Sequence, residues 1–137
     1  MTTSTPADFL ALGDERFVSL TTYRRNGEGV ATPMWIARNG ACLVVTTGAH
    51  SGKVKRLRRD PTVELRPCTR RGRVASSAPT VRGLAEIRAD PASQREVARL
   101  ICAKYGNQYR LVMLVERLLL RRRAERVALY LTAPAGP

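Results

Sequence analysis

Two Asn-Gly dipeptides, Asn26-Gly27 and Asn39-Gly40, constrain the fold of this chain more than any other sequence feature. Asn-Gly is the strongest short-range signal of a tight turn between two antiparallel strands, because both residue types tolerate a positive φ angle. Each dipeptide lies between segments rich in β-branched and apolar residues. These segments, residues 16–23, 30–38 and 41–47, are predicted to be three consecutive antiparallel strands, a meander.

The rest of the chain adds further strands without a repeating strand–helix–strand order. They are predicted at residues 62–69, 80–89 and 126–132. The pattern favours a mainly β protein with added helices, folded as a small closed or half-closed barrel, because closure removes the exposed edges of short strands. We expect a single domain over residues 1–137, since 44% hydrophobic residues suffice for one core, and a loose tail at residues 133–137.

Four helices are expected between these strands. Residues 7–12 form a short helix that closes one end of the sheet, and a basic helix runs from Ser51 to just before Pro61. A third helix begins at Asp90, with proline in its first turn, and ends before Gly106; a fourth covers residues 108–122.

The turn that leads into the basic helix is the best candidate for a ligand site. The first N–H groups of a helix have no internal partners and lie at the positive end of its dipole, so they attract phosphates and carboxylates. Basic side chains follow at once, at Lys53, Lys55 and Arg56. His50 lies in the same turn, where it could contact a ligand or simply be solvated.

The charge of the chain also indicates an anionic partner. Lys and Arg total 24 against 11 Asp and Glu, which gives a formal net charge of +13. The excess of arginine suits forked contacts with oxyanions, although codon bias in a G+C-rich genome would produce the same composition. Nucleic acid is not the expected partner, because only 5% of the residues are aromatic and no RNA-binding strand motif occurs.

The expected location is a reducing cytoplasm. The three cysteines are far apart and lack metal-binding spacing, which argues against disulfides and a zinc site. The N-terminus lacks the pattern of a secretory signal, and no apolar segment is long enough to span a bilayer, so no membrane association is expected.

No catalytic constellation is evident in the sequence. His50 is the only histidine, and neither a hydrolase elbow nor a paired-carboxylate or metal motif is present. We therefore predict no catalytic side chain and no metal ligand. The segment around Pro33 is unusual, because proline cannot donate to a strand ladder and opens the sheet locally. Trp35 is either a core or interface aromatic or a wall for a planar ligand.

Several motifs, in this order, resemble one known family. They are L-T-T-Y-R-R-N-G, T-P-M-W-I-A-R-N-G, T-T-G-A-H-S-G-K-V-K-R-L-R-R-D-P, R-P-C and V-R-G-L-A-E-I, with a later K-Y-G before a basic helix. The combination resembles the deazaflavin-using branch of the pyridoxamine 5'-phosphate oxidase-like proteins. The close match covers about residues 20–87.

The resemblance implies a split β-barrel like that of FMN-binding proteins, which forms a homodimer with the cofactor in a groove between the subunits. It assigns the cofactor phosphate to Ser51, Gly52, Lys53, Lys55 and Arg56. It assigns the cofactor side chain and ring to Thr32, Pro33, Trp35, Thr46 and Thr47.

The expected function is then an F420-dependent oxidoreductase that transfers a hydride from reduced coenzyme F420 to an activated acceptor, such as an enone, quinone, nitro compound or tetrapyrrole. Two alternatives stay open. One is an FMN-binding oxidoreductase of the same fold, and the other is a non-enzymatic carrier of F420 or haem. The choice of acceptor is expected to depend on the arginine-rich loop at residues 70–79 and on the partner subunit.

Overall fold

The computed structural model describes residues 6–119 and 125–134. Its strands are β1 (Val18–Tyr23), β2 (Gly29–Met34), β3 (Ala37–Asn39), β4 (Cys42–Gly48), β5 (Thr62–Pro67), β6 (Val81–Arg88) and β7 (Arg126–Thr132). Its helices are α1 (Pro6–Ala11), the 3-10 helix η1 (Leu12–Asp14), α2 (Gly52–Arg59), α3 (Pro91–Tyr105) and α4 (Asn107–Leu119). The predicted class, mainly β with added helices, is confirmed.

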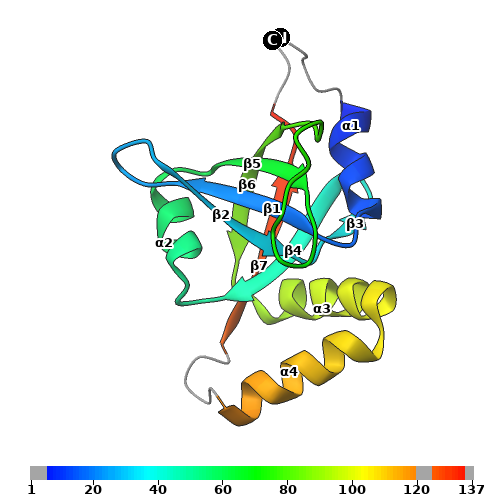
Figure 1. The fold of residues 1–137 in the computed structure, drawn as a ribbon. Helices are drawn as coiled ribbons and strands as arrows, with labels where there is room; N and C mark the ends of the chain where they lie inside the picture. The colour runs from blue at the N-terminus through cyan, green and yellow to red at the C-terminus, as the bar shows by residue number, and fades with distance from the viewer. Residues whose placement is uncertain (1–5, 120–124, 135–137) are drawn as a thin grey trace.

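The strands form one curled antiparallel sheet in the order β2-β1-β5-β6-β7-β4-β3 (Figure 1). Strands β2 and β3 follow each other in the chain but occupy opposite edges of the sheet. The sheet is therefore a half-barrel whose two edges are joined by a short crossover at Trp35 and Ile36. This arrangement confirms the split barrel that the family resemblance implied and the half-closed barrel expected from the strand pattern.

The predicted single strand at residues 30–38 is wrong, and with it the uninterrupted meander. The ladder to β1 ends at Met34, one residue after Pro33, which has no N–H to donate. The N–H of Ile36 then donates to the Tyr105 hydroxyl oxygen, at 3.1 Å. The chain thus leaves one edge and resumes pairing at the other, where β3 pairs with β4.

Both predicted hairpins are confirmed. Tyr23 pairs with Gly29 and Asn39 pairs with Cys42 across the two turns. In each turn the glycine alone carries the positive φ, 87° at Gly27 and 59° at Gly40.

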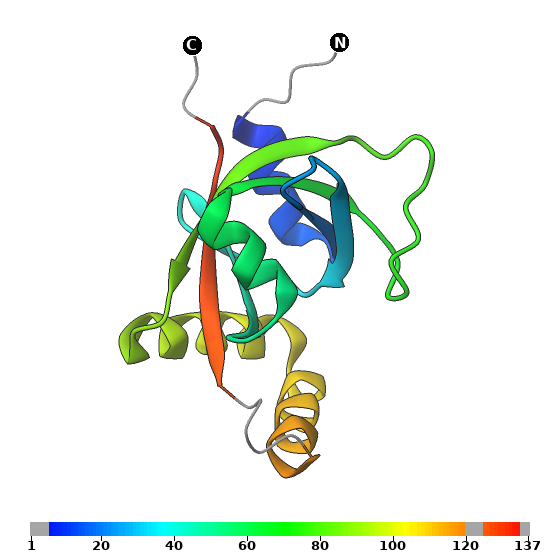
Figure 2. The same cartoon turned by 90° about the vertical axis from the view of Figure 1, so that its left-hand side faces the viewer.

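The inside of the curled sheet is filled by strand side chains that are almost fully buried, among them Leu20, Leu65 and Leu129. Helix α1 closes one end of this core through Phe9, as predicted. The ring reaches Gly83 of β6, where a Cβ atom would lie 2.9 Å from Phe9 Cε2. Helix α2 (Figure 2) contributes the buried side chain of Val54 to the same core.

A second cluster lies on the outer face of β4 and β7, where α3 packs. Ile101 and Tyr105 of α3 are buried there against Val44 and Tyr130. Helix α3 begins as predicted, because the Asp90 carboxylate accepts a hydrogen bond from the Ser93 N–H at 2.9 Å. It ends at Gly106, whose φ of 65° turns the chain into α4.

Some expectations fall on residues outside the described ranges. These are the end of the fourth helix, predicted to reach residue 122, and most of the tail at 133–137. Within the described ranges, no helix has the length and apolar character needed to cross a membrane. The exposed segment predicted at residues 70–79 is confirmed as a loop, and it extends away from the barrel between β5 and β6 (Figure 2).

Candidate cofactor-binding cleft

A cleft of about 400 Å³ opens where the crossover, the ends of β4 and β7, the start of α2 and one face of α4 meet. Its lining residues are Phe17, Pro33, Met34, Trp35, Thr46, Thr47, Gly48, Ser51, Lys53, Arg70, Val112, Met113 and Arg126. The cleft therefore joins segments from nearly the whole length of the chain around the turn between β4 and α2.

Six of the ten predicted cofactor residues lie together in this cleft: Pro33, Trp35, Thr46, Thr47, Ser51 and Lys53. The other four, Thr32, Gly52, Lys55 and Arg56, are not among its lining residues. The Thr32 hydroxyl contacts Met34 Sδ at 3.7 Å. Lys55 is exposed on α2.

The guanidinium group of Arg56 contacts β1 and the start of α2. Its Nε donates to Thr22 Oγ1 of β1 at 2.7 Å. Its Nη1 lies over Gly52, where a Cβ atom would approach it to 2.9 Å. Burial, followed by the nearby charge of Arg24, lowers the pKa of Arg56 from its ordinary value. Arg56 thus ties α2 to β1.

Ser51 occupies the position before α2, with the extended backbone of a helix cap (φ −69°, ψ 155°). Its side chain makes no capping hydrogen bond, and its Oγ is buried without a partner among the described residues. A buried hydroxyl is normally hydrogen-bonded, and an unpaired one at a ligand site is commonly satisfied by the ligand. Ser51 therefore fits a ligand with acceptor oxygens at the start of α2.

Three cationic side chains line the cleft, those of Lys53, Arg70 and Arg126. The lining contains no carboxylate. Burial lowers the pKa of Lys53, and the charges of Arg56 and Arg126 lower it further. Arg126 is held by Thr46, whose Oγ1 accepts from Nε at 3.0 Å and whose carbonyl oxygen accepts from Nη2 at 3.1 Å. An anion in the cleft would relieve the repulsion among these groups.

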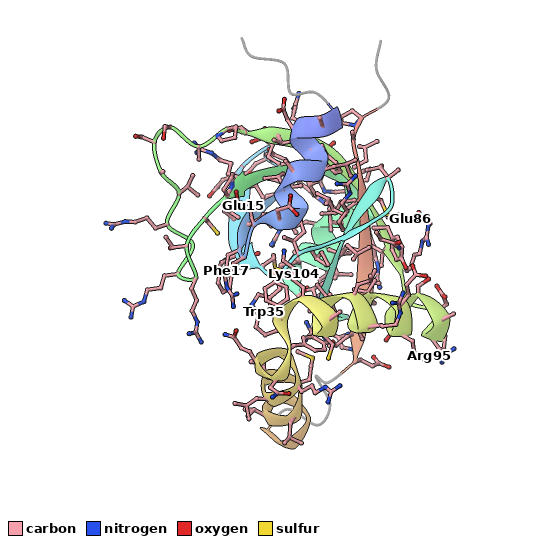
Figure 3. All side chains as sticks on the ribbon, turned by 90° about the vertical axis from the view of Figure 1, so that its right-hand side faces the viewer. Glu15, Phe17, Trp35, Glu86, Arg95 and Lys104 are labelled. Carbon is pink, nitrogen blue, oxygen red and sulfur yellow. The ribbon has the colours of Figure 1, made fainter. Side chains whose placement is uncertain are left out.

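The crossover brings Trp35 into the cleft, with Phe17 beside it (Figure 3). The Trp35 ring stacks on Tyr105, with centroids 5.2 Å apart and 23° between the planes. Lys104 donates to the carbonyl oxygens of Gly13 and Ile36, both at 2.7 Å. These contacts, all from the end of α3, fix the crossover and give the cleft a rigid aromatic wall.

Seven further lining residues were absent from the predicted set, namely Phe17, Met34, Gly48, Arg70, Val112, Met113 and Arg126. Arg126 is the first residue of β7, and it reaches the cleft because it pairs with Gly48 in the β4–β7 ladder. That pairing spans most of the chain, so no local pattern identifies it. Val112 and Met113 belong to a predicted helix whose docking position depends on the turn at Gly106.

The cleft has the composition of a binding site. Its lining includes no histidine, aspartate or glutamate, and the described residues contain no group of possible metal ligands. His50 lies outside it, with Nε2 3.0 Å from Glu125 Oε2 and both side chains largely exposed. A cation cluster beside a flat aromatic wall suits a phosphate-bearing ring compound, and the unpaired Ser51 hydroxyl fits the same ligand.

Comparisons with solved structures find the same fold. A conserved hypothetical protein from Mycobacterium tuberculosis is 24% identical, with a TM-score of 0.68 over 98% of this chain and 82% of that chain. An F420 reductase is 22% identical, with a TM-score of 0.60 over 93% of this chain and 94% of that chain. The haem storage protein HutZ from Vibrio cholerae is 13% identical, with a TM-score of 0.63 over 90% and 84%. At such identities the likeness shows the fold alone.

No curated protein matches the chain at a significant level. The family described as pyridoxamine 5'-phosphate oxidase matches residues 6–131, which include every strand and helix of the structure except the last residue of β7. The chain therefore belongs to the pyridoxamine 5'-phosphate oxidase family.

Proposed function

We propose that this chain is an F420-dependent oxidoreductase that reduces an activated small molecule, such as an enone, quinone, nitro compound or tetrapyrrole. Bound reduced F420 would supply the hydride, so the protein needs to hold and orient the reactants and not to provide a base of its own. The observation that carries the proposal is the conjunction of the unpaired Ser51 hydroxyl with Lys53 and Arg126 in one cleft. The fold likeness to an F420 reductase supports it.

In this proposal each group in the cleft has a separate task. Ser51, Lys53 and Arg126 hold the cofactor phosphate at the start of α2. Thr46 and Thr47 line the cofactor side chain, and Trp35 forms a wall for its ring. Arg70 reaches the cleft from the loop and is available to the anionic tail that distinguishes F420 from FMN.

The test is an equilibrium fluorescence titration with F420 and with FMN. Lys53→Ala is expected to weaken F420 binding by about tenfold or more, because it removes a charge-assisted contact in a partly buried site. Lys55→Ala is the matched control, since Lys55 is exposed on the same helix outside the cleft, and it is expected to change binding by less than about twofold. Equal effects of the two substitutions would refute the assigned site.

The same titration decides between the cofactors. FMN carries fewer negative charges than F420 and has less need of Arg70. Binding of FMN as tight as that of F420 would replace our proposal with an FMN-dependent oxidoreductase of the same fold.

A carrier function is a second candidate, favoured by the lack of any acidic or histidine side chain in the cleft lining. It is separated from catalysis by stopped-flow measurement of the reoxidation of bound, reduced F420. Acceleration by at least one acceptor from a panel of enones, quinones and nitro compounds supports the oxidoreductase. A rate that no acceptor changes supports the carrier.

We also propose that two copies of the chain form a homodimer with the cleft at the subunit interface. Support comes from the outer face of α4, where Leu111 and Leu114 are 62% and 53% exposed. The same helix contributes Val112 to the cleft, and Val115, which is 44% exposed, lies between Leu111 and Val112 around the helix. A second subunit that covers this face would also enclose the bound cofactor.

A reducing cytoplasm remains the proposed location of the protein. All three cysteines are free thiols in the structure, which is compatible with a compartment that keeps thiols reduced. Recovery of the tagged chain in a periplasmic or membrane fraction would contradict it.

A further inference from the structure

A second basic pocket, of about 320 Å³, lies near the other end of α2. Its lining residues are Tyr23, Arg24, Arg25, Gly27, Arg59, Asp60, Thr62 and Arg82. None of them lines the cofactor cleft. The eight residues of α2 span about 12 Å, so the two sites are separated by roughly the length of this helix.

Three elements that are distant in sequence bring the arginines of this pocket together. The β1–β2 hairpin presents Arg24 and Arg25, and it is closed by a hydrogen bond from the Arg24 N–H to the Glu28 carbonyl oxygen at 2.9 Å. Arg59, at the end of α2, is fixed by a hydrogen bond from its Nη2 to the Tyr23 carbonyl oxygen at 2.8 Å. The fourth, Arg82, comes from β6. The pocket is therefore built by the tertiary fold.

The carboxylates near the pocket are already engaged. Asp60 Oδ1 accepts from the Thr62 N–H at 3.1 Å, and this contact lowers the pKa of Asp60. Glu64 lies 3.9 Å from Arg82 Nε. Among the described residues, no side-chain hydrogen bond or ion pair holds Arg24 or Arg25. The pocket thus keeps an excess of positive charge.

We propose that this pocket binds a compact oxyanion with at least two negative charges, of the phosphomonoester or diphosphate type, independently of the cofactor cleft. Guanidinium groups match such oxyanions through paired N–H donors, and four of them line one small pocket. The volume is that of a site for a small ligand. The inference does not depend on the identity of the cofactor in the cleft.

The composition of the pocket favours a small ligand over two larger anionic partners. Single-stranded nucleic acid needs aromatic side chains for stacking, and Tyr23 is the only aromatic residue that lines the pocket. A bilayer surface is bound by basic residues together with inserted apolar ones, and no large aliphatic side chain lines the pocket.

The test is a calorimetric titration with sodium pyrophosphate at constant ionic strength, in a Lys53→Ala background that weakens anion binding in the cleft. Saturable binding is expected, and adding Arg24→Ala and Arg25→Ala is expected to weaken it by at least about tenfold. The control adds Arg95→Ala and Arg99→Ala, which remove the same charge from exposed positions on α3 and are expected to change the affinity by less than about threefold. Figure 3 shows the position of Arg95 on this helix.

The same variants are titrated with a short oligothymidylate and with vesicles that contain phosphatidylglycerol. Absence of saturable pyrophosphate binding would overturn the proposal, and so would equal losses in the two arginine pairs. Binding of the oligonucleotide or of the vesicles through Arg24 and Arg25, without binding of pyrophosphate, would also overturn it. Superimposable far-UV circular dichroism spectra establish that the variants are folded.

Discussion

The indole ring of Trp35 stacks on the phenol ring of Tyr105, with centroids 5.2 Å apart, and couples the cofactor cleft to helix α3. The same tyrosine binds the crossover backbone through its hydroxyl group, which accepts from the Ile36 N–H at 3.1 Å and lies 2.7 Å from the Arg16 carbonyl oxygen, to which it donates. One side chain thus positions both the aromatic wall and the segment that joins the two edges of the sheet.

Replacing Tyr105 with phenylalanine is expected to lower the free energy of unfolding by about 1–3 kcal/mol, because it leaves the buried Ile36 N–H without a partner while the ring stack is kept. Urea denaturation followed by circular dichroism measures the loss. Tyr130→Phe is the control, since the hydroxyl of Tyr130 donates to the side chain of the exposed Glu96 at 2.9 Å and not to the crossover, and a smaller loss is expected. Equal losses would show that the crossover does not depend on Tyr105.

Ser51→Ala is expected to weaken cofactor binding without lowering the free energy of unfolding. The Ser51 hydroxyl has no partner among the residues that the structure describes, so its removal should leave the free energy of unfolding unchanged or slightly higher. F420 binding should weaken, because the ligand loses a donor at the start of α2. Urea denaturation and fluorescence titration give the two readouts, and Ser77→Ala, in the exposed loop, is the control. A clear loss of stability would contradict the unpaired state of this hydroxyl.

Local patterns predicted most of the elements because the responsible interactions are local. The hairpin glycines Gly27 and Gly40 and the Asp90 cap act over a few residues, and the structure confirms all three. The break after Pro33 could be foreseen as an opened ladder. That the chain then crosses to the opposite edge could not, because it depends on contacts with Tyr105 far along the chain.

The residues of the candidate site also fall into those set by local sequence and those set by long-range contacts. Ser51 and Lys53 were predicted because the strand, turn and helix that hold them are continuous in sequence. Arg126 was missed because only the β4–β7 register brings it beside Thr46. Arg56 was assigned to the phosphate by its position in the family motif, and its contact with Thr22 of β1 could not be foreseen from that position. Side-chain direction depends on packing, which spacing alone does not determine.

The Asp90 cap makes the stability of α3 depend on pH. The hydrogen bond from the Ser93 N–H lowers the pKa of Asp90 below its ordinary value of 3.8. As the pH falls, the unfolded chain therefore takes up the proton first, so the stabilisation present above about pH 4 is lost as the pH falls through the folded-state pKa. Asp90→Ala is expected to lower the melting temperature at pH 7, and the difference from the wild type should shrink toward pH 3.

Asp90→Asn is the matched control for this effect, because asparagine keeps a capping oxygen that does not titrate. It is expected to stay close to the wild type at pH 7 and to show a weaker change between pH 5 and pH 3. Thermal denaturation at a series of pH values measures both variants. A difference between Asp90→Ala and the wild type that stays constant down to pH 3 would contradict the assigned cause.

Substitutions on the exposed apolar face of α4 test the proposed homodimer. Leu111 and Leu114 lie on the face of α4 opposite to Tyr109, which is buried against α3. Leu111→Asp with Leu114→Asp is expected to convert a dimer to a monomer, because two carboxylates cannot be buried in an apolar interface without partners. Light scattering after size-exclusion chromatography measures the mass. Leu84→Asp, at an exposed leucine of β6, is the control and is expected to leave the dimer intact. A monomeric mass for the wild type at its highest soluble concentration would refute the homodimer and leave the cleft to one chain.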